Sequence, residues 1–260
     1  MNDAEESVLY GLTGYPLGHS FSKTFFTDKF RAEGLGAEYR NFPLQELNRE
    51  SIVRLATEHP ELRGLNVTAP HKRAAYALAD YRTAEAEAAQ AANTLLIRRS
   101  AAGDGLLIEA HNTDIEGFRE ALRPYLDKSE GERRAFVCGS GGAGEAVRIA
   151  LRQLGIESRT VSRNPDKTER AISYADLCSL LGPRDIIVNA TPIGTWPATE
   201  GYLPLPYEQL GPDNIFADLV YNPAETTMMR MASEAGATAF NGRRMLELQA
   251  LASYKFWNQL

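Results

Sequence analysis

A glycine-rich segment near the middle of the chain constrains the fold most. In FVCGSGGAGEAV, Gly139, Gly141 and Gly144 form Gly-x-Gly-x-x-Gly directly after a strand-like run and directly before a helix-like one. Glycine lets backbone approach a pyrophosphate, and the following helix N-terminus offers amide donors. A purely structural tight turn is the alternative, but the strand and helix around the pattern favour dinucleotide binding. The other residues of the predicted binding loop are Ser140, Gly142 and Ala143.

Strand-like and helix-like segments alternate on both sides of this loop, which favours parallel sheets. Before the loop, we expect strands at 8–14, 37–43 and 62–68, helices at 22–34, 47–59 and 72–81, and a hairpin over 93–114. A helix at 115–125 and the polar stretch LDKSEGERR follow. We then expect strands at 135–139, 158–162, 185–190, 215–220 and 237–240, with a last helix at 243–258. The pattern predicts an α/β protein with a first domain over 1–113 and a Rossmann-type, doubly wound domain over 114–241.

Composition narrows the classes of protein and partner. The 260 residues suffice for two modest α/β domains, and an apolar content of 43% is that of an ordinary globular protein. With 28 basic and 34 acidic residues, the net charge of −6 argues against nucleic acid as a partner. The first residues, MNDAEES, are acidic where a signal peptide would be basic, and no apolar run approaches the ~18 residues of a membrane span. We therefore expect a cytoplasmic protein. Its expected partner is a small molecule, and the chain is expected to be a monomer or a homodimer, between which the sequence does not decide.

The cysteines and histidines do not predict a metal site. Cys138 and Cys178 stand in neither a C-x-x-C nor a ligand-like spacing, and both lie among apolar residues, which is typical of buried core thiols. The four histidines show no metal-ligand spacing either.

The end of the second Rossmann strand bears on the choice of cofactor. An Asp or Glu there normally binds the adenosine ribose of NAD, but this chain has Ser162, Arg163 and Asn164. A guanidinium is a planar, always charged donor that suits a 2′-phosphate. The sequence therefore favours NADP, with a solvated loop arginine as the alternative.

Polar residues of the first domain gather where predicted strands end and helices begin, in GHSFS, NVTAPHK, AANT and HNTD. The carboxyl ends of strands in an open parallel sheet face the ligand crevice. Hydroxyls, amides, one cation and one anion there would suit a small polyhydroxylated acid. Taken singly, the serines and the aspartate could be helix caps and Asn93 a turn residue. The candidates are Ser20, Ser22, Asn66, Thr68, Lys72, Asn93 and Asp114.

These motifs resemble those of the shikimate dehydrogenase family, and the resemblance runs over roughly residues 10–257. HSFS, NVTAPHK, AANT and HNTD match the family's substrate motifs, and GSGGAG and SRN match its nucleotide loop and the next strand end. NATPIG, DLVYNP and the closing NG to LELQ follow in order. The resemblance implies reversible NADPH-dependent reduction of 3-dehydroshikimate to shikimate, a step of aromatic amino-acid biosynthesis. It also implies that a C-terminal helix, 242–260, returns to complete a substrate-binding domain over 1–113.

The resemblance also implies roles for single residues. Ser20 and Ser22 would bind the substrate carboxylate, with Tyr221 nearby. The ring hydroxyls would contact Asn66, Thr68, Lys72, Asn93, Asp114 and Gln249. Thr191 of NATPIG and Gly242 of the closing NG would join the cofactor-binding residues.

Three departures from the family pattern stand out. His71 occupies a position where many members have Phe, and NTDIEGF replaces the commoner Asn-Thr-Asp-Gly-x-Gly-Phe. Arg243 and Arg244 stand where Leu-Gly is usual, which bears on how the last helix meets the substrate.

Lys72 fits the acid that such a reaction needs. A hydride added to a ketone leaves a developing alkoxide, which requires a proton and a positive neighbour. A lysine with its ordinary pKa of about 10.4 is a good acid for protonating the alkoxide. Asp114 would orient the lysine and accept a hydrogen bond from a substrate hydroxyl. A surface lysine at a helix start is the structural alternative. Two functional alternatives stay open: an NAD-preferring quinate/shikimate dehydrogenase, and a protein that binds shikimate-like ligands without turning them over.

Overall fold

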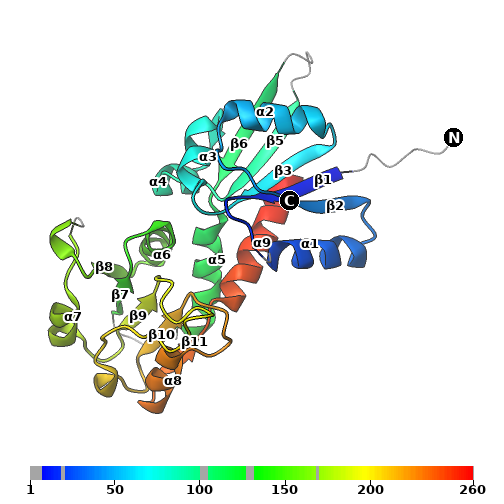
Figure 1. Cartoon of the computed structure of the whole chain (residues 1–260). Coiled ribbons are helices and arrows are strands. Elements are labelled where there is room, and N and C mark those ends of the chain that lie inside the picture. Colours follow the sequence, from blue (N-terminus) through cyan, green and yellow to red (C-terminus); the bar gives the residue numbers. More distant parts are fainter. Residues whose placement is uncertain (1–7, 19–20, 100–104, 127–131, 168–169, 260) are drawn as a thin grey trace. The chain divides into compact units, whose positions relative to one another are not determined.

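The computed structural model describes residues 8–18, 21–99, 105–126, 132–167 and 170–259. Its Cα trace divides into two compact units, one of residues 1–113 and 249–260 and one of residues 114–248. Each unit contains its own β-sheet flanked by helices, so the predicted α/β class is confirmed (Figure 1). The division falls inside the last helix, α9 (Arg243–Asn258), whereas the sequence placed a boundary at residue 242.

The first unit is built on a mixed sheet in the order β2-β1-β3-β5-β6-β4. β1 is parallel to β2 and β3, while β5 is antiparallel to both β3 and β6. The β5–β6 pair confirms the predicted hairpin. The strands are β1 (Val8–Thr13), β2 (Ala37–Phe42), β3 (Leu62–Val67), β4 (Tyr81–Arg82), β5 (Thr94–Arg99) and β6 (Leu106–His111).

The helices of this unit depart from the sequence prediction in one region. The helix expected over 72–81 ends at Leu78, and Tyr81 instead begins β4, which is parallel to β6. Local propensity could not place a two-residue edge strand, because its pairing is supplied by β6 from a distant part of the sequence. The helices are α1 (Phe21–Ala32), α2 (Arg49–Glu58), α3 (Lys72–Leu78), α4 (Ala84–Ala89) and the C-terminal part of α9.

The two faces of this sheet carry separate apolar clusters, because successive strand residues point to opposite faces. One cluster contains Leu9 and Leu65 and packs beneath α2, α3 and α4. The other contains Tyr10 and Tyr39, packed against Phe26 of α1 and Trp257 of α9. The last helix therefore returns to the N-terminal unit, as the sequence predicted.

The second unit contains a fully parallel sheet in the order β11-β10-β9-β7-β8. The chain passes from β7 to β8 on one side and then to β9 on the other, which is the doubly wound topology, and ligands bind at its switch point. Its strands are β7 (Arg134–Cys138), β8 (Glu157–Val161), β9 (Ile186–Asn189), β10 (Ile215–Asp218) and β11 (Thr238–Phe240). Its helices are α5 (Thr113–Leu122), η1 (Arg123–Tyr125), α6 (Gly142–Gln153), η2 (Pro165–Lys167), α7 (Tyr174–Leu180), η3 (Tyr207–Gln209) and α8 (Thr227–Glu234).

Candidate active site

The glycine loop connects β7 to α6 at the switch point of the sheet, and close packing requires two of its glycines. Gly139 has φ +119°, in the region that favours glycine, and a Cβ there would lie 2.9 Å from the carbonyl oxygen of Ala190. A Cβ on Gly144 would collide with the carbonyl oxygen of Gly139. Strand and helix can therefore meet this closely only because both residues lack a side chain.

The middle glycines of the loop have a different environment. Gly141 is the N-cap residue of α6, and a Cβ on Gly141 or Gly142 would meet no heavy atom within 4 Å. The space above these residues leaves room for a pyrophosphate at the helix N-terminus, where amide donors and the helix dipole favour an anion. The loop therefore fits the dinucleotide that its sequence predicts.

A cavity of about 330 Å³ opens beside this loop within the second unit. Thr191 lies in its wall, with its hydroxyl donating to Asn189 Oδ1 at 2.7 Å. Gly242 packs behind the wall, where its amide donates to Val220 O and a Cβ would collide with Leu219 O. The cavity thus brings together three predicted site residues, Ala143 of the glycine loop and Thr191 and Tyr221 from two different strand ends. Its lining is Ala143, Ala190, Thr191, Pro192, Thr195, Leu219, Val220, Tyr221 and Asn222.

The predicted 2′-phosphate ligands lie just beyond β8. Arg163 is exposed, and the Asn164 amide donates to Ser162 Oγ at 3.1 Å, which closes the turn that holds it. Burial raises the pKa of Tyr174, while the positive charge of Arg163 opposes that rise. Tyr174 also hydrogen-bonds Cys138, the residue before Gly139. The strand end that leads to Arg163 lies beside the start of the glycine loop, because the Gly139 backbone amide donates to Val161 O at 3.1 Å.

Lys72 is positioned by a turn that other loops of the first unit hold in place. Its carbonyl accepts from the Ala92 amide at 2.8 Å, which ties the start of α3 to the segment before Asn93. The preceding His71 is buried, and its Nε2 lies 2.7 Å from Leu44 O. The Thr68 amide donates to Thr13 O at 2.9 Å, and both Thr68 and Lys72 are half-buried. A phenylalanine at position 71 could not hydrogen-bond to Leu44 O. His71 therefore gives the turn before Lys72 a polar contact that phenylalanine would lack.

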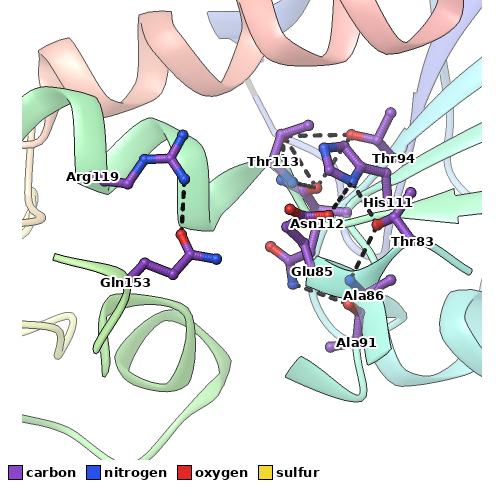
Figure 2. Close-up of polar contacts among 11 residues, drawn as sticks. Thr83, Glu85, Ala86, Ala91, Thr94, His111, Asn112, Thr113, Arg119 and Gln153 are labelled. Atoms are coloured by element: carbon purple, nitrogen blue, oxygen red, sulfur yellow. Dashed lines mark hydrogen bonds and ion pairs between the residues drawn. The ribbon is translucent and has the colours of Figure 1, made fainter. Parts of the chain in front are cut away.

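Asn93 anchors the segment that leads to Asp114. Its Oδ1 accepts from the Thr113 amide at 2.8 Å, and its Nδ2 donates to Thr113 Oγ1 at 2.9 Å. Figure 2 shows Thr113 turned toward Thr94, with His111 and Asn112 turned toward Thr83 and Ala91. Asp114 follows as the half-buried second residue of α5.

Asn66 and Gln249 join the same buried polar network from β3 and α9. Asn66 Oδ1 accepts from the Tyr39 hydroxyl at 2.8 Å, and its Nδ2 donates to Ser253 Oγ at 2.8 Å. Thr113 Oγ1 lies 3.4 Å from Gln249 Oε1. Polar groups buried this deeply need partners, and here they find them in one another.

Of the two serines predicted to bind the substrate carboxylate, Ser22 lies at the start of α1. Ser22 is the second residue of that helix, and its side chain hydrogen-bonds Tyr39. That hydrogen bond lowers the pKa of the Tyr39 phenol against the larger rise caused by burial. Ser20 lies outside the described residues.

Four residues of this polar network were not predicted from the sequence: Tyr39, Thr94, Thr113 and Ser253. Thr94 and Thr113 stand inside AANT and HNTD, next to residues that were singled out, and Ser253 follows Gln249 by one helical turn. Each of these residues carries a hydroxyl on a strand or helix face that is otherwise apolar. Which face that is can be known only from the structure.

The described part of the chain contains neither a metal-binding cluster nor a membrane-spanning helix. No group of three or more His, Cys, Asp and Glu side chains in it could hold a metal ion. No helix in it is long and apolar enough to cross a membrane.

Comparison with known proteins places these features among relatives. The family described as the shikimate dehydrogenase substrate binding domain matches residues 12–95. The NADP(+) shikimate dehydrogenase of Maridesulfovibrio salexigens is 34% identical over 256 residues, which cover 96% of this chain and 90% of that protein. Both proteins therefore align over nearly their whole length.

Solved structures of relatives share the fold. Shikimate 5-dehydrogenase from Thermus thermophilus, in complex with NADP(H) and shikimate, matches with a TM-score of 0.79 at 30% identity, over 97% of this chain and 94% of that one. Quinate dehydrogenase from Corynebacterium glutamicum, in complex with NAD, matches with a TM-score of 0.84 at 26% identity, over 98% and 94% of the two chains.

Proposed function

The chain belongs to the shikimate dehydrogenase family, and we propose from this premise that it catalyses the reversible NADPH-dependent reduction of 3-dehydroshikimate to shikimate. The observation that carries the proposal is the convergence of Asn66, Asn93 and Gln249, from β3, the β5 start and α9, on one polar network. Such a cluster of amides and hydroxyls in a unit whose cores are otherwise apolar suits a small polyhydroxylated acid.

NADP would be held by the second unit. The open space above Gly141 and Gly142 supports a pyrophosphate at the N-terminus of α6, and Arg163 supports a 2′-phosphate at the end of β8. Bound NADPH would supply the hydride. Thr191 and the cavity beside it would receive the nicotinamide end. The proposed cofactor-binding residues are Gly139, Ser140, Gly141, Gly142, Ala143, Gly144, Ser162, Arg163, Asn164, Thr191 and Gly242.

Lys72 would supply the proton in the reducing direction. The oxygen of the ketone becomes an alkoxide, and the Lys72 ammonium both stabilises that charge and donates a proton to it. In the reverse direction the neutral amine accepts the hydroxyl proton. Asp114 would orient the ammonium and accept a hydrogen bond from a substrate hydroxyl, so we assign the two residues jointly.

The other ligands would fix the substrate ring. Ser20 and Ser22 would bind the carboxylate, with Tyr221 as a further donor. Thr68, Asn93 and Gln249 would bind the ring hydroxyls, each presented by a strand end or by α9. Multiple hydrogen bonds to one rigid ring would hold the reacting carbon in a single orientation for hydride transfer.

A quinate dehydrogenase is the second candidate, because the relative from Corynebacterium glutamicum shares this fold and was solved with NAD. Four assays decide between the two candidates: shikimate and quinate, each with NADP and with NAD, followed by the absorbance of the reduced nicotinamide. We expect shikimate with NADP to give the highest kcat/KM. Highest activity with quinate and NAD would reverse the assignment, and shikimate binding without turnover would make the chain a ligand-binding protein.

A further inference from the structure

The hydroxyl of Ser253 is the point where the polar network of the first unit converges. Its Oγ accepts from Asn66 Nδ2 at 2.8 Å, lies 2.8 Å from Thr94 Oγ1 and 3.2 Å from Thr113 Oγ1, and donates to Gln249 O at 3.0 Å. These four partners come from β3, β5, the start of α5 and the preceding turn of α9. Ser253 itself is fully buried, so it offers no surface to a ligand.

The protons of this network follow from the donor inventory. The Tyr39 hydroxyl donates to Asn66 Oδ1, which fixes the amide so that Nδ2 faces Ser253 and Thr94, the latter at 3.3 Å. Both Nδ2 hydrogens of Asn66 are thereby used inside the protein. Ser253 Oγ gives its one proton to Gln249 O, so Thr94 Oγ1 is the donor in its 2.8 Å contact with Ser253 Oγ. The orientation of Asn66 thus fixes the hydroxyls of Ser253 and Thr94. Thr113 Oγ1, which lies 3.2 Å from Ser253 Oγ, accepts from Asn93 Nδ2 at 2.9 Å and extends the network to Asn93.

We propose that Ser253 is a positioning residue for the substrate site, which it serves by holding Gln249, Asn93 and Asn66 in their binding geometry. The inference rests on the proposed function, because it takes these three residues to belong to the shikimate site. Gln249 stands one turn before Ser253 on the same helix, and Thr113 directly precedes Asp114. A single buried hydroxyl therefore connects α9 to the segments that carry the polar ligands.

Removal of the Ser253 hydroxyl leaves each of its buried partners without one hydrogen bond. Asn66 Nδ2 and the hydroxyl of Thr94 or Thr113 would each have to rotate toward a new partner, and reorienting them displaces the amides of Asn93 and Gln249. A buried polar group that loses its partner is costly, so the network would rearrange rather than keep its geometry. Substrate binding should suffer more than the chemical step.

The experiment compares Ser253→Ala with Tyr254→Phe, its neighbour on α9. Each variant removes one hydroxyl from the same helix, but Tyr254 bonds Glu33 Oε2 at 2.7 Å and touches none of the network. We expect Ser253→Ala to raise KM for shikimate about 10-fold, with a smaller change in kcat and with KM for NADP within about 2-fold of wild type. Tyr254→Phe should leave all three constants near wild type, whatever its effect on Tm.

A second variant checks that the effect passes through the network. Thr94→Val keeps the side-chain shape and removes the hydroxyl from β5. It should also raise KM for shikimate several-fold, and the double variant with Ser253→Ala should raise it by clearly less than the product of the single effects, because both changes break one network. Thr94→Val also carries the test if Ser253→Ala does not fold.

The outcomes separate this inference from the proposed function. If the wild type turns over shikimate but Ser253→Ala and Thr94→Val leave its KM unchanged while lowering Tm, the hydroxyl is merely structural and the inference is overturned alone. If the two effects multiply, Ser253 and Thr94 act independently, which also overturns it. A wild type that neither binds nor turns over shikimate overturns the proposed function and this inference together.

Discussion

The indole of Trp257 lies so close to Gly64 of β3 that a Cβ at residue 64 would overlap the ring. The indole is held there by stacking on Tyr10, with ring centroids 4.5 Å apart, and by donating Nε1–H to Leu95 O at 3.0 Å. Gly64 and Trp257 lie far apart in the sequence. Their contact packs α9 against the sheet and thereby fixes the positions of Gln249 and Ser253 on that helix.

Gly64→Ala should therefore displace α9 from the sheet. The added methyl group has no room, because the indole is fixed on two sides, so we expect the free energy of unfolding to fall by about 1–3 kcal/mol and KM for shikimate to rise. Thermal unfolding and steady-state kinetics measure both effects. Gly105→Ala is the control, since a Cβ there meets no atom of the described residues within 4 Å. Equal stability of the two variants would contradict the packing argument.

Lys72→Ala tests the acid–base assignment. The interaction with the alkoxide exists mainly in the transition state, so kcat should fall by about 10²-fold or more while KM for shikimate changes far less. Arg73→Ala, which removes a cation from the next position of α3, should keep kcat near wild type. A Lys72→Ala variant with kcat within a few-fold of wild type would show that another group supplies the proton.

The proposed carboxylate anchor is tested by replacing Ser20 and Ser22 together with alanine. Both hydroxyls would bind substrate equally in the ground state and the transition state, so KM for shikimate should rise strongly while kcat changes little. KM for NADP should stay near wild type and serves as the internal control. An unchanged KM for shikimate would show that the two serines do not bind the substrate carboxylate.

The two kinds of glycine in the loop should respond differently to alanine. Gly144→Ala forces a methyl group against the carbonyl of Gly139 and should lower stability by about 2 kcal/mol or more. Gly141→Ala places its methyl group in open space, so Tm should hold while KM for NADP rises about 10-fold, because the methyl group obstructs the pyrophosphate. If Gly141→Ala binds NADP normally, the loop is a structural turn.

Arg163→Ala tests the choice of cofactor. A guanidinium on a 2′-phosphate makes charge-assisted hydrogen bonds worth about 1.5–3 kcal/mol, so KM for NADP should rise roughly 10- to 150-fold. NAD has no such phosphate, and its kinetics should stay within a few-fold. Added salt should weaken NADP binding more in the wild type than in the variant. Arg159→Ala, an exposed arginine on β8, is the matched control; equal losses for NADP and NAD in Arg163→Ala would make Arg163 an ordinary surface residue.

Local patterns in the sequence predicted much of this architecture. The glycine spacing and the alternation of strands and helices predicted the doubly wound unit, because both express short-range requirements of backbone and periodicity. The β5–β6 hairpin was predicted by two apolar runs around a Gly/Asp turn. The β4 strand was not predicted, and α3 is shorter than expected. Tyr81 and Arg82 pair with β6, although their local sequence favours a helix.

The sequence by itself determined which chemical groups this protein possesses: the glycine loop, Arg163, Lys72 and the amides and hydroxyls of its short motifs. Only the tertiary structure decided how these groups are connected. Asn66 is a ligand predicted from the sequence, and the structure shows that its amide is held by Tyr39, Thr94 and Ser253. Those partners stand up to 187 positions away, and no local pattern links them. Hydrogen bonds at short range in space but long range in sequence exist only after the sheet and α9 have packed, so the division between binding and positioning residues is a property of the fold.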